Sequence, residues 1–466
     1  MDRSSTLAAA VIVATASFLT SGPFTGVAGA ATSCSFDEGT HVVTVVFDAG
    51  SHTLDRSGSA IRLDGSACGT ATVTTTDIVQ MTGAAGATLT IDLSGGPFAP
   101  GATDEGDGSS EIELTVELEG AAETGLHIGV AGTEGADHVL VGRRDIPGTF
   151  FTDAIDLNAD ETVLDADVYT QNGMWADVTV DGLGGDDDLR GYFPCDGDDG
   201  VLPAFFPVTI DAGPGDDTLG WWAYGGELNG GEGRDLIDDT LVGDRLSIWL
   251  AEGEILGGTY RITASNLEDA IGGLDDDLIV AGSGGATIAG GAGDDDLFGS
   301  EAADVIDGGS GWDQVYAFGG DDHLVGGGDP LDVVGFTEPV TVDLEAGTAT
   351  GEGNDTLDGF HVIWGSASND TILGATGDDV LRGFGGADDL HGRRGDDQIY
   401  GGAGDDHLLG GRGQDALLGE RADDSLNGGH AHDLCDGGLG THDTSVRCED
   451  EANVPRHAAS ALAGPV

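Results

Sequence analysis

A nine-residue pattern of glycine, aspartate and aliphatic residues repeats without interruption in the last quarter of the chain. From Gly365 to Asp436, eight consecutive nonapeptides each begin with Gly and each carry Asp at the sixth position. Seven of the eight have Ile or Leu at the eighth position, and Cys435 takes that place in the remaining unit. A fixed short period of this kind predicts a solenoid, in which each repeat stacks on its neighbours.

Within each unit the pattern predicts a turn followed by a very short strand. Gly at the first positions permits backbone conformations with positive φ, which other residues adopt only at a cost. The last three residues form the strand, and the eighth side chain points inward because alternate side chains lie on opposite faces. Two units then make one coil, and stacked coils bury a thin aliphatic ladder. Its members are Ile372, Leu381, Leu390, Ile399, Leu408, Leu417 and Leu426.

The sixth-position carboxylates are the candidate chemistry of this pattern. In successive coils they are expected about 4.8 Å apart, the spacing of neighbouring strands. Each uncompensated pair would cost about 3 kcal/mol at an effective dielectric constant of about 20, so a hard divalent cation is needed to reverse the cost. Calcium tolerates about six to eight flexible oxygen ligands, which suits Gly-rich turns better than the strict octahedron of magnesium. We therefore expect calcium sites in the turns.

The composition agrees with this expectation. The chain has 85 acidic and 16 basic residues, a formal net charge of −69 and 84 glycines, and all of its basic residues are Arg. Internal salt bridges can neutralise only a small part of this charge. Nucleic acid and anionic membranes bind basic surfaces, so we expect no nucleic-acid partner and no membrane insertion. Disorder is the other outcome for an acidic chain, but disordered chains do not keep an inward aliphatic residue in phase.

The units resemble the repeats-in-toxin (RTX, haemolysin-type) calcium-binding nonapeptide Gly-Gly-x-Gly-x-Asp-x-apolar-x of secreted bacterial proteins. Gly401–Leu409 fits that nonapeptide at every position. The resemblance implies an all-β fold, a right-handed parallel β-roll or β-solenoid with calcium between the turns of adjacent coils. It also implies ligation by the sixth-position Asp and by backbone carbonyls. The ligands implied in the block from residue 365 are Asp370, Asp379, Asp388, Asp397, Asp406, Asp415, Asp424 and Asp433.

Two further blocks and three isolated units extend the resemblance toward the N-terminus. The block at 272–325 implies ligation by Asp277, Asp295, Asp304, Asp313 and Asp322. In its second unit Ala286 replaces the Asp, which argues against a site there. The looser block at 212–247 implies Asp217, Asp235 and Asp244, and the isolated units imply Asp137, Asp187 and Asp355.

These patterns divide the chain into seven parts. They are a signal peptide (1–30), an N-terminal β domain or solenoid cap (31–131), degenerate repeats with strand insertions (132–271), a repeat block (272–334), a strand insertion (335–364), a repeat block with a C-terminal cap (365–448) and a tail (449–466). Apolar and polar residues alternate in the manner of antiparallel strands at His41–Phe47, Ala87–Leu93 and Glu111–Leu118. Similar alternation predicts strand insertions at Val340–Ala349 and Leu246–Gly253.

The N-terminal residues predict export. An apolar stretch from Leu7 to Leu19 is followed by small residues, with cleavage expected after Ala30. We therefore expect a secreted, extracellular protein, in which disulfides are permitted. The spacing of the five cysteines suggests the pairs Cys34–Cys68 and Cys435–Cys448. Cys195 is left over, either as a buried thiol or as a reactive or intermolecular one.

Enzymatic motifs are missing from the sequence. It contains no His-Glu-x-x-His, no Gly-x-Ser-x-Gly and no Lys for a phosphate-binding loop. The sequence favours a non-enzymatic calcium-binding protein, structural or adhesive, with an unidentified cell-surface or matrix partner. The alternative is a secreted hydrolase with an unrecognised active site in residues 31–211. Two features stay open: a further calcium site at Asp104, Asp107 and Glu111 or a solvated loop, and Trp221–Trp222 as a sugar platform or as coil filling.

Overall fold

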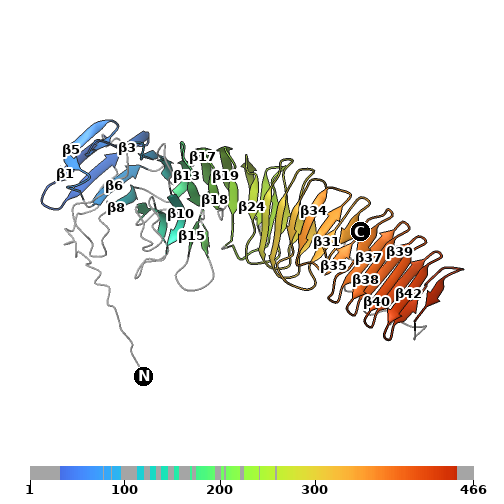
Figure 1. Ribbon diagram of the computed structural model, residues 1–466. Coiled ribbons are helices and arrows are strands. Elements are labelled where there is room, and N and C mark those ends of the chain that lie inside the picture. Colours follow the sequence, from blue (N-terminus) through green and yellow to red (C-terminus); the bar gives the residue numbers. More distant parts are fainter. Residues whose placement is uncertain are drawn as a thin grey trace, which may run out of the picture.

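Two long β-sheets wind around one narrow core in the computed structural model of the protein, and successive coils follow one another along a rod (Figure 1). The structure describes residues 32–76, 78–84, 87–95, 113–119, 126–132, 138–144, 152–156, 168–170, 175–190, 192–194, 201–203, 206–220, 225–240, 242–257 and 260–448. Every regular element among these residues is a strand. None of them forms a helix with the length and apolar character needed to cross a membrane.

Several predicted features lie outside the described residues. They are the export signal, the C-terminal tail, Asp137, Cys195, the acidic loop with Asp104, Asp107 and Glu111, and the Trp221–Trp222 pair.

The strands belong to two large sheets and one small hairpin. Sheet A contains β1 (Ser33–Asp37), β2 (Val42–Phe47), β6 (Ile78–Ala84), β8 (Glu113–Glu119), β10 (His138–Arg144), β11 (Thr152–Asp156), β12 (Val168–Thr170), β14 (Asp188–Arg190), β18 (Thr218–Gly220), β20 (Leu236–Asp238), β24 (Asp269–Ile271), β26 (Thr287–Ala292), β28 (Val305–Ser310), β30 (His323–Val325), β32 (Thr341–Asp343), β33 (Thr348–Thr350), β34 (Asn354–Asp358), β36 (Thr371–Leu373), β38 (Asp389–Arg394), β40 (His407–Arg412), β42 (Ser425–His430) and β44 (Thr444–Val446). Sheet B contains β3 (Ser51–Ser57), β4 (Ala60–Leu63), β5 (Ser66–Thr72), β7 (Thr88–Asp92), β9 (Leu126–Ala131), β13 (Trp175–Asp181), β17 (Val208–Pro214), β19 (Gly226–Glu232), β21 (Leu246–Trp249), β22 (Glu254–Gly257), β23 (Tyr260–Ser265), β25 (Leu278–Val280), β27 (Asp296–Phe298), β29 (Gln314–Tyr316), β31 (Val333–Gly335), β35 (Val362–Trp364), β37 (Val380–Gly385), β39 (Gln398–Ala403), β41 (Ala416–Arg421) and β43 (Leu434–Asp436). The hairpin is β15 (Tyr192–Pro194) with β16 (Val201–Pro203).

The predicted coil of two nonapeptides is confirmed by the strand register. In sheet A, Leu390 of β38 lies opposite Leu408 of β40, and Leu408 lies opposite Leu426 of β42. In sheet B, Ile399 of β39 lies opposite Leu417 of β41. All of these pairings are parallel and join residues 18 positions apart. Consecutive units therefore alternate between the two sheets.

The aliphatic ladder forms the core, as predicted. Its seven members from Ile372 to Leu426 are at most 1 % exposed. Each side chain packs between the equivalent residues of the coils above and below, and the residues on either side of it in the strand face outward. In the block from residue 365, each coil thus contributes one pair of ladder side chains, so the core there is long and thin.

The N-terminal strands continue the same two sheets. β2, β6 and β8 pair in parallel in sheet A, and β3, β7, β9, β13 and β17 pair in parallel in sheet B. The antiparallel pairing expected for the strands at 42–47, 88–92 and 113–119 is therefore wrong in most contacts, and it holds only where β1 meets β2 at the end of the rod. Alternation of apolar and polar residues indicates only that one face of a strand is buried. A parallel roll with its core inside and water outside produces the same alternation as an antiparallel sheet.

Both predicted strand insertions are antiparallel excursions from the coil. β21, β22 and β23 form one in sheet B, and β32, β33 and β34 form the other in sheet A. In each case the outer strands of the excursion still pair in parallel with the neighbouring coils. The insertions thus lengthen single coils without interrupting the stack.

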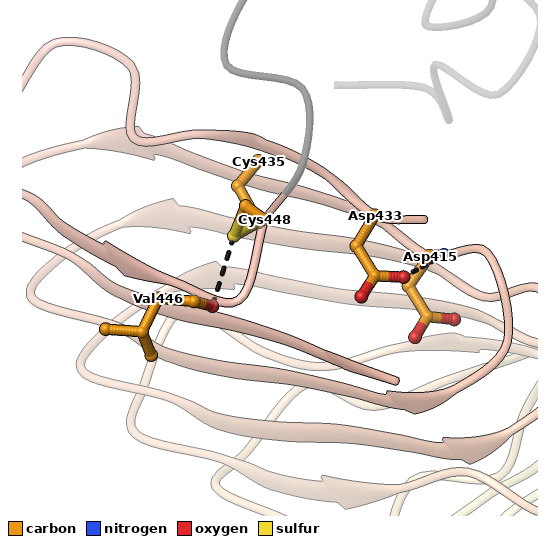
Figure 2. The surroundings of a disulfide bond; sticks show 5 residues. All are labelled: Asp415, Asp433, Cys435, Val446 and Cys448. Atoms are coloured by element: carbon orange, nitrogen blue, oxygen red, sulfur yellow. Dashed lines mark hydrogen bonds between the residues drawn. A yellow bond between two sulfur atoms is a disulfide. The ribbon is translucent and has the colours of Figure 1, made fainter. Parts of the chain in front are cut away.

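Both predicted disulfides are present, one near each end of the described chain. Cys34 of β1 is bonded to Cys68 of β5, and Cys435 of β43 is bonded to Cys448. The second bond lies beside the last coil, close to Asp415 and Asp433 (Figure 2). Because the end of a solenoid has no further coil to pack against it, a covalent closure there restrains the coil that is most exposed to fraying.

The ladder predicts a position-specific cost of truncation. We expect Leu408→Ala, measured by chemical denaturation in excess calcium, to lower the free energy of unfolding by about 3 kcal/mol because it opens a cavity between Leu390 and Leu426. The matched control is Leu409→Ala, since Leu409 is the next residue but faces outward. Its loss should stay below about 1 kcal/mol. Equal losses for the two variants would contradict the assigned inward face.

Candidate calcium sites

The predicted ligands that the structure describes are buried, with one exception. Sixteen aspartates at position six, including the isolated Asp187, are 0–2 % exposed, although they lie in turns. They are Asp187, Asp217, Asp235, Asp277, Asp295, Asp304, Asp313, Asp322, Asp370, Asp379, Asp388, Asp397, Asp406, Asp415, Asp424 and Asp433. Asp355 is buried in the same way. The exception is Asp244, which is exposed, so it does not lie among the buried carboxylates and stays a predicted ligand only. The looser repeat has lost its phase there because β21 begins the insertion directly afterwards.

These aspartates are arranged in two files, one along each edge of the roll, and every file member except the exposed Asp443 is buried. In most rungs the backbone N–H of one aspartate donates to Oδ1 of the aspartate in the next coil, at 2.7–3.2 Å. The A file precedes the strands of sheet A and contains Asp187, Asp217, Asp235, Asp304, Asp322, Asp355, Asp370, Asp388, Asp406, Asp424 and Asp443. The B file precedes the strands of sheet B and contains Asp277, Asp295, Asp313, Asp332, Asp379, Asp397, Asp415 and Asp433.

The second carboxylate oxygen is the group that points to a ligand. While Oδ1 is fixed by the preceding coil, Oδ2 of the interior aspartates is buried and accepts no hydrogen bond. This holds for Asp217, Asp235, Asp295, Asp313, Asp322, Asp355, Asp388, Asp397, Asp406, Asp415 and Asp424. A buried carboxylate oxygen without a donor is costly, and folded proteins contain few such groups. Eleven such oxygens in two files therefore point to a cation as the partner of these carboxylates.

The electrostatics of the files agree with this assignment. Burial, reinforced by neighbouring carboxylates, raises the pKa of ten carboxyl groups in the two files well above its usual value. It raises the pKa to about 7 in Asp295, Asp322, Asp388 and Asp397. It raises the pKa to about 6 in Asp235, Asp277, Asp313, Asp406, Asp415 and Asp424. Without a metal ion these groups therefore hold protons more tightly than ordinary aspartates do.

The glycine at position one makes room for this carboxylate. A Cβ on Gly401 would lie 2.4 Å from Oδ2 of Asp406, and one on Gly392 would lie 2.1 Å from Oδ2 of Asp397. Neither glycine has a positive φ. The positive φ expected for the turn occurs instead at the second and fourth positions, such as Gly404, with a φ of 144°. The first glycine is thus required by space beside the carboxylate rather than by backbone conformation.

Four of the predicted ligands differ from the others, because a backbone N–H already occupies their Oδ2. The N–H four residues earlier donates to Oδ2 of Asp277, Asp304, Asp370 and Asp379, at 2.6–2.7 Å. Each of the four is the first aspartate of a run. The residues that precede them in the files are Leu246, Ala286, Val340 and His361. No aspartate-bearing repeat turn precedes the first aspartate of a run. The Oδ2 atom of that aspartate accepts a backbone N–H from its own turn instead.

The files are interrupted in two places where another residue takes the position of aspartate. The sequence predicted only the interruption at Ala286. Ala286, expected to lack a site, contributes only its backbone N–H to Asp304. One coil earlier, Oε2 of Glu268 accepts the N–H of Asp235, so a longer carboxylate replaces aspartate. In the B file His361 occupies the aspartate position, with Nδ1 3.0 Å from Oδ1 of Asp379. Both interruptions lie beside strand insertions.

Asp332 and Asp443 belong to the files although the repeat did not predict them. The N–H of Asp313 donates to Oδ1 of Asp332, and that of Asp424 donates to Oδ1 of Asp443. Both partners lie 19 rather than 18 residues further along the chain. One extra residue in the turn moves the aspartate out of the nine-residue phase. A search for the period that allowed a single insertion would have found Asp332, which is followed by Val333 and Val334.

The residues present fit calcium. All side-chain donors in the files are oxygen atoms apart from His361, and the turns supply backbone carbonyls close to them. For example, the carbonyl oxygen of Gly428 would lie 2.5 Å from a Cβ on Gly410, the glycine that faces Asp415. Arg190, Arg234 and Arg393 form ion pairs with aspartates outside the files. Calcium would supply positive charge to paired carboxylates of adjacent coils and so join the coils.

Comparison with known proteins agrees with the repeat. The model of the RTX calcium-binding nonapeptide repeat (4 copies) matches residues 271–306, 298–329, 364–398, 382–417 and 415–441. These segments lie within the two regular repeat blocks and include most of both files. No curated protein matches the chain.

The raised pKa values predict opposite pH dependences with and without calcium. In chelator the folded chain holds more protons than the unfolded chain, so stabilisation by these groups is complete below their unfolded pKa. This stabilisation is lost as the pH rises through about 6 to 7, the raised pKa values of the folded chain. In chelator, the thermal midpoint should therefore decrease as the pH is raised from about 5 to about 7.5.

In excess calcium the thermal midpoint should instead rise over the same pH range, because protons and calcium compete for the same oxygens. Circular dichroism melting curves in both buffers measure the two slopes. Slopes of the same sign would mean that calcium does not act through these carboxylates.

Gly401→Ala tests the space beside the carboxylate. The added Cβ displaces Oδ2 of Asp406, so more calcium should be needed to fold the chain, and stability in calcium should fall by about 1–3 kcal/mol. Gly284→Ala is the matched control, because a Cβ at Gly284 meets nothing within 4 Å. Calcium titrations of both variants measure the calcium concentration at the midpoint of folding. Equal midpoints for both variants would show that the glycine does not shape the site.

Proposed function

Because the C-terminal half of the chain carries RTX calcium-binding nonapeptide repeats, we propose that this is an extracellular protein whose β-roll folds on calcium and acts as a structural or adhesive element rather than as an enzyme. In this proposal the interior aspartates of both files are the calcium ligands. Asp277, Asp304, Asp370 and Asp379 each begin a run within the files and bind calcium weakly or not at all. Asp137 stays an expected ligand outside the described residues.

One observation carries the proposal, namely the regular burial of Oδ2 without a hydrogen-bond donor. A carboxylate in that position must either be protonated or face a cation. The pH outside cells is too high for full protonation of groups with a pKa of about 6 to 7. Calcium is the hard cation that is abundant there, and it matches the oxygen donors.

The size of the effect supports folding on calcium. Extracellular modules bind calcium with dissociation constants near about 10⁻⁴ M, so at about 10⁻³ M calcium each site adds about 1.4 kcal/mol to stability. Over eleven interior carboxylates the sum is comparable to the whole stability of a typical domain. The core of the block from residue 365, with one pair of ladder side chains per coil, is thin by comparison.

An extracellular, non-enzymatic role is supported by several features of the chain. Two disulfides are typical of an oxidising compartment. The coils follow one another along a rod, and such solenoids provide extended surfaces and spacers. Turnover of peptide, ester or glycan substrates by the purified protein would contradict the non-enzymatic part of the proposal.

Calcium titration of two neighbouring aspartates gives the sharpest test. Asp405 and Asp406 lie in one turn, and each Oδ1 accepts a backbone N–H from an adjacent coil. Only Asp406 is buried, with Oδ2 unsatisfied, whereas Asp405 is exposed. Asn at either position keeps the Oδ1 acceptor and removes the same formal charge.

We expect the metal-free chain to gain β structure on addition of calcium, and much less on addition of magnesium at equal concentration. Far-ultraviolet circular dichroism follows the titration. Asp406→Asn should shift the midpoint to higher calcium and lower stability by at least about 1.4 kcal/mol, whereas Asp405→Asn should leave both nearly unchanged. A spectrum that calcium does not alter would refute folding on calcium, and equal shifts for the two variants would refute the assigned ligand.

A further inference from the structure

Three side chains on the outer face of sheet A form a second kind of cluster near the C-terminal end of the rod. Asp389 and His391 come from β38, and His407 comes from the adjacent strand β40 (Figure 1). Asp389 lies opposite His407 in the parallel register. Leu390 and Leu408 point into the core, so these three residues point outward, away from the buried files.

The three side chains converge on one point. Nδ1 of His407 lies 2.8 Å from Oδ1 of Asp389, and Nε2 of His391 lies 3.6 Å from the same oxygen. One nitrogen from each ring and the carboxylate oxygen all lie within 4.8 Å of one another. A hydrogen bond explains the contact of His407 with Asp389. It does not explain His391, because 3.6 Å is too long for a hydrogen bond.

The donor set differs from that of the files. Two imidazole nitrogens and one carboxylate oxygen suit a borderline divalent transition ion such as zinc, whereas calcium takes oxygen donors. Zinc bound at about 2.0–2.1 Å in a tetrahedron requires its ligands to lie about 3.4 Å apart. The two nitrogen-to-oxygen distances, 2.8 and 3.6 Å, lie on either side of that value, so the side chains would have to rotate to bind the ion. These rotations meet little resistance, because all three side chains are at least one-third exposed.

We propose that Asp389, His391 and His407 form a zinc site on the outer surface of the roll, separate from the calcium sites in its turns. Three protein ligands leave one tetrahedral position open to water or to a donor from another molecule. The ion joins β38 to β40 across the sheet and so links two adjacent coils from outside. Nothing in this site depends on the assignment of the calcium ligands.

The test is a zinc titration of the full chain, without an affinity tag, in saturating calcium near pH 7.5, where imidazole is mostly neutral. Circular dichroism first confirms that each variant is folded. Calorimetry should show one zinc ion bound per chain at this site. His391→Ala and His407→Ala should each weaken zinc binding roughly tenfold or more, and Asp389→Asn should weaken it in the same direction. Cobalt in place of zinc should give visible absorption bands that are lost in both histidine variants.

His323→Ala is the matched control. His323 occupies the same position of the repeat as His407 and also lies in sheet A. Its Nδ1 contacts Oγ1 of Thr356, and it belongs to no comparable cluster within the described residues. Its replacement should leave zinc affinity unchanged. The proposal is overturned if the folded wild-type chain does not bind zinc, if His391→Ala and His407→Ala bind it as tightly as the wild type, or if His323→Ala weakens it equally.

Discussion

A carboxylate that is removed from water and held beside another carboxylate is unfavourable unless a proton or a cation accompanies it. The roll repeats this arrangement at the interior rungs of two files, with Oδ1 fixed by the coil before it and Oδ2 buried. The turn chemistry follows from it. Glycine stands at position one because the carboxylate lies against its Cα, and glycines at later positions carry the positive φ of the turn.

The same constraint explains how the ends and interruptions of the files are built. Where a run begins, as at Asp370 and Asp379, a backbone N–H takes the place of the cation. Strand insertions lie at these points, so extra strands are accommodated where no cation has to be shared between turns. The aliphatic ladder follows the same period but contributes only one pair of side chains per coil. The core and the files therefore share one period along the roll.

Much of this arrangement could be predicted from the phase of one repeat. Because Gly, Asp and the aliphatic residue recur every nine positions, the inward ladder, the coil of 18 residues and sixteen buried aspartates follow directly. Asp332 and Asp443 were not predicted, because one added residue in the turn moves each of them out of the nine-residue period. The turn accommodates that residue, and the aspartate keeps its place in the file. The capped carboxylates and the parallel pairing of the N-terminal strands were not predicted for another reason. Both depend on which segment lies in the adjacent coil, and the local alternation of apolar and polar residues does not identify that segment. The same applies to His391 and His407, which lie 16 positions apart and meet only through the sheet.

The most direct measurement is an anomalous diffraction experiment on crystals grown in excess calcium. The account predicts calcium peaks beside Oδ2 of the interior aspartates, such as Asp388, Asp397 and Asp406, and none beside Oδ2 of the capped Asp370 and Asp379. An intact roll whose interior carboxylates have no calcium beside them would contradict it.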